Sequence, residues 1–179
     1  DEKLDTLVTQ LAEQVSKTIV EKAEQLLPQV VTREDRLAAL KKQFPKGKKP
    51  SVLISIAERH VGQATIDPAA ETELSLWCKD LGFEVLDPAT AGRNQADLVI
   101  TGEGFSEFAS RHGNLISVKA RLEIKAVERA SSNIVAIDRE VAVTVDLTEQ
   151  IAGKKALQDA TIAIAERLLP KLVAAEKNK

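Results

Sequence analysis

The sequence predicts an α/β fold with a mixed sheet: a β–α–β unit, then a three-stranded antiparallel meander and a closing helix, preceded by an N-terminal helical hairpin. Three observations predict it. Residues 96–147 read as three consecutive strands that lead directly into a long helical pattern over residues 148–172. Upstream, an apolar run at residues 52–57 is followed by a helical pattern and a second strand. Helical periodicity dominates residues 3–44.

The middle strand of the meander, residues 117–127, has the clearest pattern. Apolar residues occupy one face: Val118, Ala120, Leu122, Ile124 and Ala126. Charged residues occupy the other face: Lys119, Arg121, Glu123 and Lys125. This period of two predicts a sheet with one buried face and one solvated, charged face.

The amino-terminal residues predict two helices. An apolar stripe that includes Leu7, Leu11 and Val15 marks an amphipathic helix over residues 3–27, and Thr32 is placed to cap a shorter helix through about Phe44. The segment PKGKKP, residues 45–50, reads as a linker. We therefore expect a helical hairpin at 1–45 and an α/β domain at 51–179. The stripe should be buried against this domain or a second copy.

Local signals predict the details of the α/β domain. Asp67 and Pro68 suit the cap and first position of a helix that runs through about Leu81 and ends at Gly82. The strand FEVLD follows, and β–α–β order favours parallel pairing. Arg139 interrupts an otherwise apolar row in the last strand, which predicts a bulge or a break there.

Composition excludes several classes of function. The 179 residues include 25 basic and 27 acidic ones, and 3% are aromatic, which argues against nucleic-acid binding. A single cysteine, Cys78, allows no internal disulfide, and no apolar run is long enough to span a membrane. With only two histidines, we expect no metal site, and we expect no cofactor.

Two groups of residues are candidates for function. Glu58, Arg59 and His60 follow the first strand, where open α/β sheets often bind ligands, and are read as a candidate ligand loop. The sequence pairs no serine or cysteine nucleophile with them, so no catalytic residue is assigned. The outward residues Lys119, Arg121, Glu123 and Lys125 form a candidate partner surface, suited to docking a protein by surface contact or strand addition.

The segments ADLVITGEG, ARLEIKAVERASSNIVAIDREV and IAGKKALQDATIAIAERLLPKL resemble the CsgG, TolB amino-terminal and LpoB group of bacterial envelope proteins. The flagellar assembly protein FlgT contains related domains. The resemblance covers residues 51–172. It implies a non-enzymatic domain in or near the periplasm, often in a lipoprotein, that assembles with partners. The sequence lacks an amino-terminal lipid-acceptor cysteine and the long membrane-inserting segments of the curli pore, so the resemblance transfers neither anchoring nor pore formation.

We therefore expect a non-catalytic protein of the periplasm or cell envelope. It should bind other proteins or itself, and the amino-terminal helices offer one route to a homo-oligomer. Two alternatives stay open. One is a small-ligand-binding or enzymatic domain that uses Glu58, Arg59 and His60. The other is an RNA-binding module, which the charge balance and the scarcity of aromatic residues disfavour.

Overall fold

The computed structural model describes residues 2–26, 31–44, 47–65, 67–92 and 95–176. The chain divides into two compact units, residues 1–33 and 34–179. The first unit contains helix α1 (Glu2–Leu26), and the division falls at the first residue of α2 (Arg33–Gln43). The expected domains at 1–45 and 51–179 stay a prediction, since Pro45 and Lys46 of the linker lie outside the described residues.

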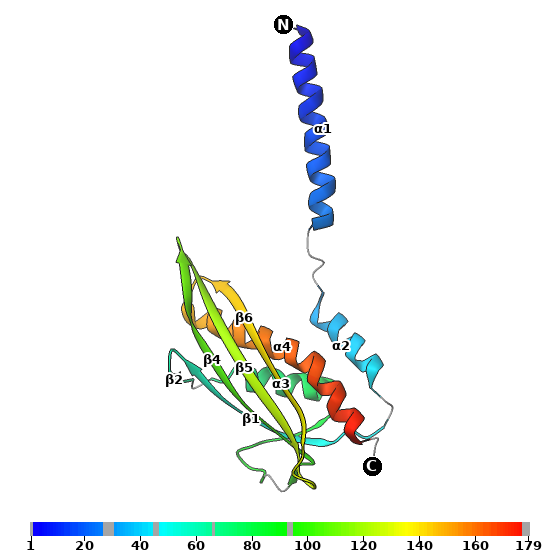
Figure 1. Cartoon of the computed structure of the whole chain (residues 1–179), viewed down its shortest axis with the longest axis vertical. Coiled ribbons are helices and arrows are strands. Elements are labelled where there is room, and N and C mark those ends of the chain that lie inside the picture. The colour runs from blue at the N-terminus through cyan, green and yellow to red at the C-terminus, as the bar shows by residue number, and fades with distance from the viewer. Residues whose placement is uncertain (1, 27–30, 45–46, 66, 93–94, 177–179) are drawn as a thin grey trace. The chain divides into compact units, whose positions relative to one another are not determined.

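Within the described residues, the second unit contains one mixed sheet of six strands (Figure 1). They are β1 (Ser51–His60), β2 (Gln63–Ala64), β3 (Glu84–Leu86), β4 (Leu98–His112), β5 (Leu115–Glu128) and β6 (Ile134–Asp146). The order is β2-β1-β4-β5-β6, with β3 also paired to β1. Strands β1 and β4 are parallel, and β4, β5 and β6 form the predicted antiparallel meander.

The predicted β–α–β unit is confirmed. Helix α3 (Ala70–Asp80) connects β1 to β3, and these two strands are parallel. Gly82 follows the helix with φ of 86°, a conformation that glycine adopts without steric cost. Its N–H donates to the Lys79 carbonyl, and the Phe83 N–H donates to the Cys78 carbonyl, which satisfies the last helical carbonyls.

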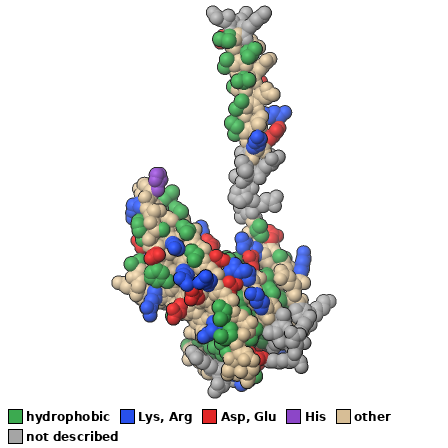
Figure 2. Space-filling model, viewed as in Figure 1, with side chains coloured by type: hydrophobic (Ala, Val, Ile, Leu, Met, Phe, Trp, Pro, Cys, Tyr) green, Lys and Arg blue, Asp and Glu red, His purple; other side chains and the backbone are tan. Residues whose placement is uncertain are grey.

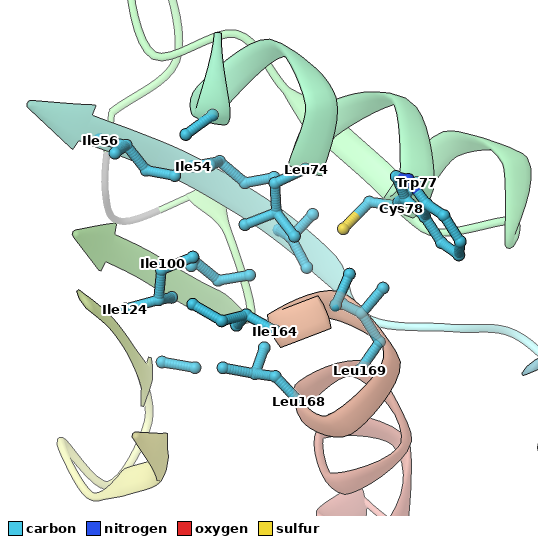
Figure 3. Close-up of a cluster of buried hydrophobic side chains, with 14 of the residues drawn as sticks. Ile54, Ile56, Leu74, Trp77, Cys78, Ile100, Ile124, Ile164, Leu168 and Leu169 are labelled. Carbon is cyan, nitrogen blue, oxygen red and sulfur yellow. The ribbon is translucent and has the colours of Figure 1, made fainter. Parts of the chain in front are cut away.

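Helices α3 and α4 (Glu149–Glu176) pack on the same face of the sheet. Between them and the strands lies a core of aliphatic side chains, with Trp77 and Cys78 from α3 (Figure 3). The alternation in β5 is confirmed, since Val118, Ala120, Leu122, Ile124 and Ala126 are all buried. On α4, Leu157, Ile164, Leu168 and Leu172 are buried as expected, but Ile151 is exposed, although the next residue, Ala152, is buried against Ile116 and Val118.

Helix α2 belongs to the α/β unit. Leu37 and Leu40 join the main hydrophobic core, and Arg36 Nη1 lies 3.1 Å from Glu166 Oε1 of α4.

Helix α1 belongs to the first unit. Within this unit Leu7, Leu11 and Val15 are more than half exposed, and their burial against the α/β domain or a second copy stays a prediction. In the described residues, no helix is both long and apolar enough to cross a membrane.

Candidate functional site

The face of the sheet opposite α3 and α4 has no helix packed on it in the described residues, and we call it the open face. Its predicted residues Lys119, Arg121, Glu123 and Lys125 are all exposed, as the alternation in β5 requires. The strand register places Arg121 between Phe105 of β4 and Val141 of β6, and Phe105 next to Arg59 of β1. The structure therefore brings Arg59, predicted as part of a ligand loop, onto the candidate partner surface.

The open face also carries large apolar side chains that the sequence analysis missed. They are between 40% and 62% exposed and comprise Phe105, Ile137, Val141, Val143 and Val145. In space-filling view, apolar, basic and acidic side chains lie intermixed over the sheet (Figure 2). Exposed large apolar side chains together with charged ones are found on surfaces that bind other proteins.

The apolar row of β6 is the origin of this error. The sequence predicted a bulge or a strand break at Arg139, because this residue interrupts the otherwise apolar row of Val135, Ile137, Val141 and Val143. Ile137, Val141 and Val143 instead face outward, as does Arg139, whereas Val135 packs against the core. The register with β5 is regular around Arg139. The shifts of register lie between Phe108 and Ser110 and between Ala126 and Val127. Both rows of β6 contain apolar and charged residues, so the sequence of this strand does not show which of its faces the closing helix covers.

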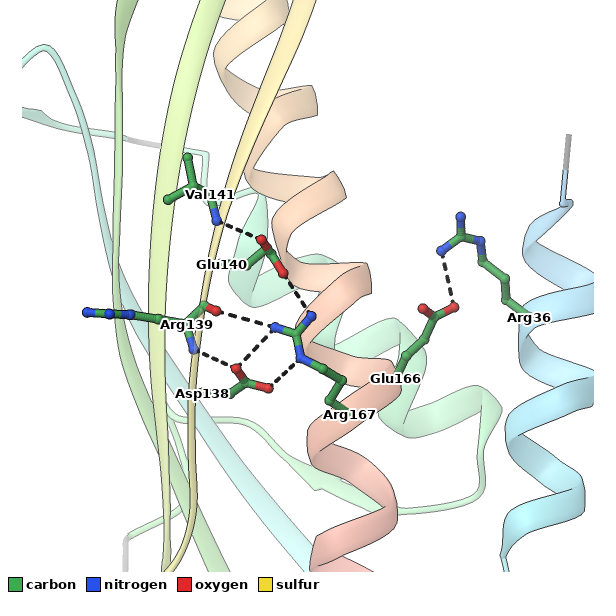
Figure 4. Close-up of polar contacts among 7 residues, drawn as sticks. All are labelled: Arg36, Asp138, Arg139, Glu140, Val141, Glu166 and Arg167. Atoms are coloured by element: carbon green, nitrogen blue, oxygen red, sulfur yellow. Dashed lines mark hydrogen bonds and ion pairs between the residues drawn. The ribbon is translucent and has the colours of Figure 1, made fainter. Parts of the chain in front are cut away.

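The inner row of β6 contains Asp138 and Glu140, and Arg167 of α4 forms ion pairs with both (Figure 4). Arg167 Nε and Nη1 lie 2.8 Å from Asp138 Oδ2 and Glu140 Oε2, respectively. The hydrogen bonds donated by Arg167 lower the pKa of each carboxyl group below its ordinary value, with smaller contributions from backbone N–H groups. Ionised carboxylates on the helix-covered face are tolerated because this guanidinium pairs with them.

The side chains of Asp138, Glu140 and Arg167, which we call the β6 cluster, also form hydrogen bonds with backbone groups at the centre of β6. This strand lies at the edge of the sheet. Asp138 Oδ1 accepts the Arg139 N–H at 2.8 Å, and Glu140 Oε1 accepts the Val141 N–H at 3.0 Å. Arg167 Nη2 donates to the Arg139 carbonyl at 3.3 Å. An added strand would need these backbone groups, so the cluster protects the edge. Docking on the open face is thus favoured over strand addition at this position.

The second candidate region lies at the end of β1. This strand extends through His60, so the prediction that Glu58, Arg59 and His60 form a loop was wrong. The antiparallel bridge from β2 to Arg59 and His60 lengthens the strand. Glu58 and His60 share the helix-covered face, whereas Arg59 lies on the open face.

Glu58 caps helix α3 from the neighbouring strand. Its Oε2 accepts the Ala69 N–H at 2.8 Å, and its Oε1 accepts those of Ala70 at 2.8 Å and Glu71 at 3.0 Å. Burial raises the pKa of Glu58 above its ordinary value, and these three hydrogen bonds offset part of that rise. The predicted cap at Asp67 and Pro68 is corrected, since α3 begins at Ala70 and its cap residue, Ala69, has no side-chain cap.

His60 is held between two other polar side chains. Its Nδ1 lies 2.9 Å from Ser106 Oγ, and its Nε2 lies 3.5 Å from Glu149 Oε1. Gly153 of α4 packs against them, since a Cβ at this position would lie 3.1 Å from Ser106 Oγ and 3.2 Å from His60 Nδ1. Glycine therefore lets the first turns of α4 approach the strands closely.

Beside this group lies a pocket of about 340 Å³. Its polar lining includes Glu58, His60, Gln63, Ser106, Gln150 and Lys154. Serine, histidine and glutamate in this order have the chemistry of a nucleophile, a base and an orienting acid. However, the amide groups that begin α3 at this pocket are bonded to Glu58 and are not available to stabilise an oxyanion. The pocket is better suited to binding a small polar molecule than to acyl transfer.

The remaining titratable candidates have structural explanations. Cys78 is fully buried, and burial raises the pKa of its thiol to about 12, so it packs in the core as expected. His112 is exposed at the β4–β5 turn. Among the described residues, no group of three or more histidine, cysteine, aspartate or glutamate residues is placed to hold a metal ion.

No protein-family model matches the sequence, and no curated protein matches it. The structure is similar to a Helicobacter pylori homolog of neuraminyllactose-binding hemagglutinin (18% identity, TM-score 0.48, 76% of this chain and 95% of that one). It is also similar to a Xanthomonas campestris protein of the DUF330 family (13% identity, TM-score 0.47, 75% of this chain and 90% of that one). A third similar structure is the LpoB C-terminal domain from Salmonella enterica (12% identity, TM-score 0.34, 59% of this chain and 93% of that one).

LpoB is thus among the proteins of similar structure, while the wider membership of the CsgG, TolB and LpoB group stays a prediction. Every one of these TM-scores is below 0.5 and every identity is below 25%. They carry no conclusion about function, which we argue from the residues of this chain.

Proposed function

We propose that this protein is a non-catalytic module of the cell envelope that binds another protein through the open face of its sheet. The observation that carries the proposal is the exposed apolar set on this face, formed by Phe105, Ile137, Val141, Val143 and Val145. The envelope location follows from the resemblance of residues 51–172 to envelope proteins.

The charges of the open face indicate what kind of surface the partner has. Outward residues of β1, β4, β5 and β6 supply five basic side chains, Arg59, Lys119, Arg121, Lys125 and Arg139. They supply three acidic ones, Glu103, Glu107 and Glu123, of which Glu123 is paired with Arg121. The basic excess favours a partner with an acidic surface, and the apolar set requires that this surface also present apolar side chains.

Phe105 and Arg121 are the expected anchors of this interface. They are cross-strand neighbours near the middle of the sheet, and aromatic and arginine side chains contribute most to binding when a partner covers them. A shallow hollow of about 640 Å³ adjoins both and is bordered by Glu107, Lys119, Arg139, Glu140 and Val141. A protruding apolar side chain of the partner would fit there.

We expect Val141→Glu to reduce capture of the partner from a cell-envelope extract about tenfold or more, because it places within the apolar set a negative charge that an acidic partner surface repels. Leu76→Glu on α3 is the matched control. Leu76 is 46% exposed and Val141 is 47% exposed, and charged side chains are tolerated both in helices and on edge strands. Quantitative mass spectrometry of the captured proteins makes the comparison. Equal capture by the two variants would contradict the proposal.

A second candidate function is the binding of a small polar molecule at the end of β1. The favouring observation is the pocket of about 340 Å³ beside the group formed by Ser106, His60 and Glu149. In this function His60 would bond the ligand, and Gly153 would keep α4 close enough to complete the pocket.

For this second function, we expect native mass spectrometry to detect a small molecule retained by the wild-type protein and lost in His60→Ala. His112→Ala is the control, since it removes the other histidine from an exposed turn. A wild-type protein that binds nothing from a panel of polar metabolites, or that loses its ligand equally in both variants, would leave only the protein-binding function.

A further inference from the structure

Helix α1 carries an apolar stripe that no described residue of its own unit covers. Leu4, Leu7, Val8, Leu11, Val15 and Ile19 are each between 51% and 67% exposed. In space-filling view the apolar side chains follow one another along the helix (Figure 2). A 25-residue helix with this much apolar surface gains free energy when a partner covers the stripe.

The spacing of the stripe indicates what covers it. Leu4, Val8, Leu11 and Val15 are separated by four, three and four residues, which is a heptad repeat. Valine occupies the a positions, 8 and 15, and leucine occupies the d positions, 4 and 11. β-Branched residues at a with leucine at d favour parallel two-stranded coiled coils.

The flanking positions are compatible with a second identical helix. In a parallel pair, each g residue faces the next e residue of the partner helix. These positions would pair Leu7 with Ala12 and Gln14 with Ile19, so no like charges meet between residues 4 and 19. The apolar repeat ends after Val15, because Thr18 would occupy the next d position and Lys22 the next a position.

A lipid surface fits the helix less well. Residues 2–26 contain five acidic residues, Glu2, Asp5, Glu13, Glu21 and Glu24, against three basic ones, Lys3, Lys17 and Lys22. The helix has no tryptophan or phenylalanine. Helices that lie on membranes are rich in basic residues on the polar face and in aromatic residues on the apolar face, and anionic lipids repel an acidic excess.

We propose that α1 pairs with α1 of a second copy of this chain as a parallel, in-register coiled coil over residues 4–18. Val8 and Val15 of one copy lie against the same residues of the other, and Leu4 and Leu11 complete the seam. The inference stands on α1 and is independent of the partner of the open face.

Single cysteines in the full-length chain test the pairing and its direction. Parallel, in-register helices bring position 8 next to position 8 and position 15 next to position 15. We therefore expect Val8→Cys and Val15→Cys each to form disulfide-linked dimers about tenfold faster than Glu13→Cys, which lies on the opposite side of the helix. The native Cys78 does not interfere, because it is fully buried.

Other results would overturn the proposal. Antiparallel helices would crosslink mixtures of the two valine variants but neither variant alone, and chance collision would oxidise all three variants equally. Sedimentation equilibrium of the wild type should show a concentration-dependent dimer that Leu11→Asp abolishes. A wild type that stays monomeric, or that binds anionic vesicles instead, contradicts the pairing. None of these outcomes depends on Val141, so failure here is distinguishable from failure of the proposed function.

Discussion

Replacing Leu122 with alanine is expected to lower the free energy of unfolding by about 2–5 kcal/mol, as large-to-small changes in a packed core do. Leu122 is fully buried in the main core. It lies opposite Gly104 of β4, and a Cβ added at Gly104 would approach both Leu122 and Leu157. Truncation therefore leaves a cavity between β5 and α4 that the surrounding backbone cannot close without moving a helix. Chemical denaturation measures the change.

Lys125→Ala is the control for this prediction. It lies on the same strand but on the open face, where it is exposed, and its loss should change stability by less than about 0.5 kcal/mol. If the two variants lowered the free energy of unfolding equally, β5 would not present Leu122 and Lys125 to opposite faces of the sheet.

Replacing Glu58 with alanine is expected to cost about 2–4 kcal/mol, which is an unusually large effect for a charged residue. The N–H groups of Ala69, Ala70 and Glu71 lose their acceptor, and two of these hydrogen bonds are buried. An unsatisfied buried donor costs about 1–3 kcal/mol. Glu58→Gln should lose less, because its amide oxygen can still accept from Ala70 and Glu71.

The neighbouring residue supplies the control. Arg59→Ala alters the same strand end on the opposite face, where no described contact depends on it, and should change stability by less than about 0.5 kcal/mol. Thermal and chemical unfolding of the three variants test the capping role. A Glu58→Ala protein as stable as Arg59→Ala would return Glu58 to the ligand-binding candidates.

The capping role also limits how the enzymatic alternative at Glu58, Arg59 and His60 can be tested. A triple alanine variant of residues 58–60 would remove a helix cap, an open-face side chain and the pocket histidine together. Any loss of binding would then mix unfolding of α3 with loss of the site. His60→Ala alone leaves the bonds between Glu58 and α3 in place and addresses the pocket directly.

For the glycines of the segment TGEGF, the sequence predicts that something approaches the strand, and the tertiary structure shows which groups do so. Glycine inside a strand predicts a bulge or close backbone approach. The structure shows close approach: a Cβ at Gly102 would lie 2.6 Å from the Glu123 carbonyl oxygen, and one at Gly104 would lie 3.1 Å from Leu157 Cδ2. The identity of the approaching groups depends on β5 and α4, which are distant in sequence.

The sequence by itself determined the order of the elements except β2, the parallel β1–β3 unit, the meander and the burial of β5. These features depend on periodicity and on turn residues within a few positions of one another. Alternation in β5 is unambiguous because its two faces differ in polarity.

Only the tertiary structure decided which face of β6 is buried and what Glu58 does. Both rows of β6 mix apolar and charged residues, so their burial depends on Arg167, which follows Asp138 by 29 residues and pairs with it on the covered face. Glu58 reads locally as a solvated loop residue, yet the N-terminus of α3 lies above it and offers three N–H groups. Interactions between distant segments set the environment of these charges, because a carboxylate can be buried only where donors from elsewhere in the fold meet it.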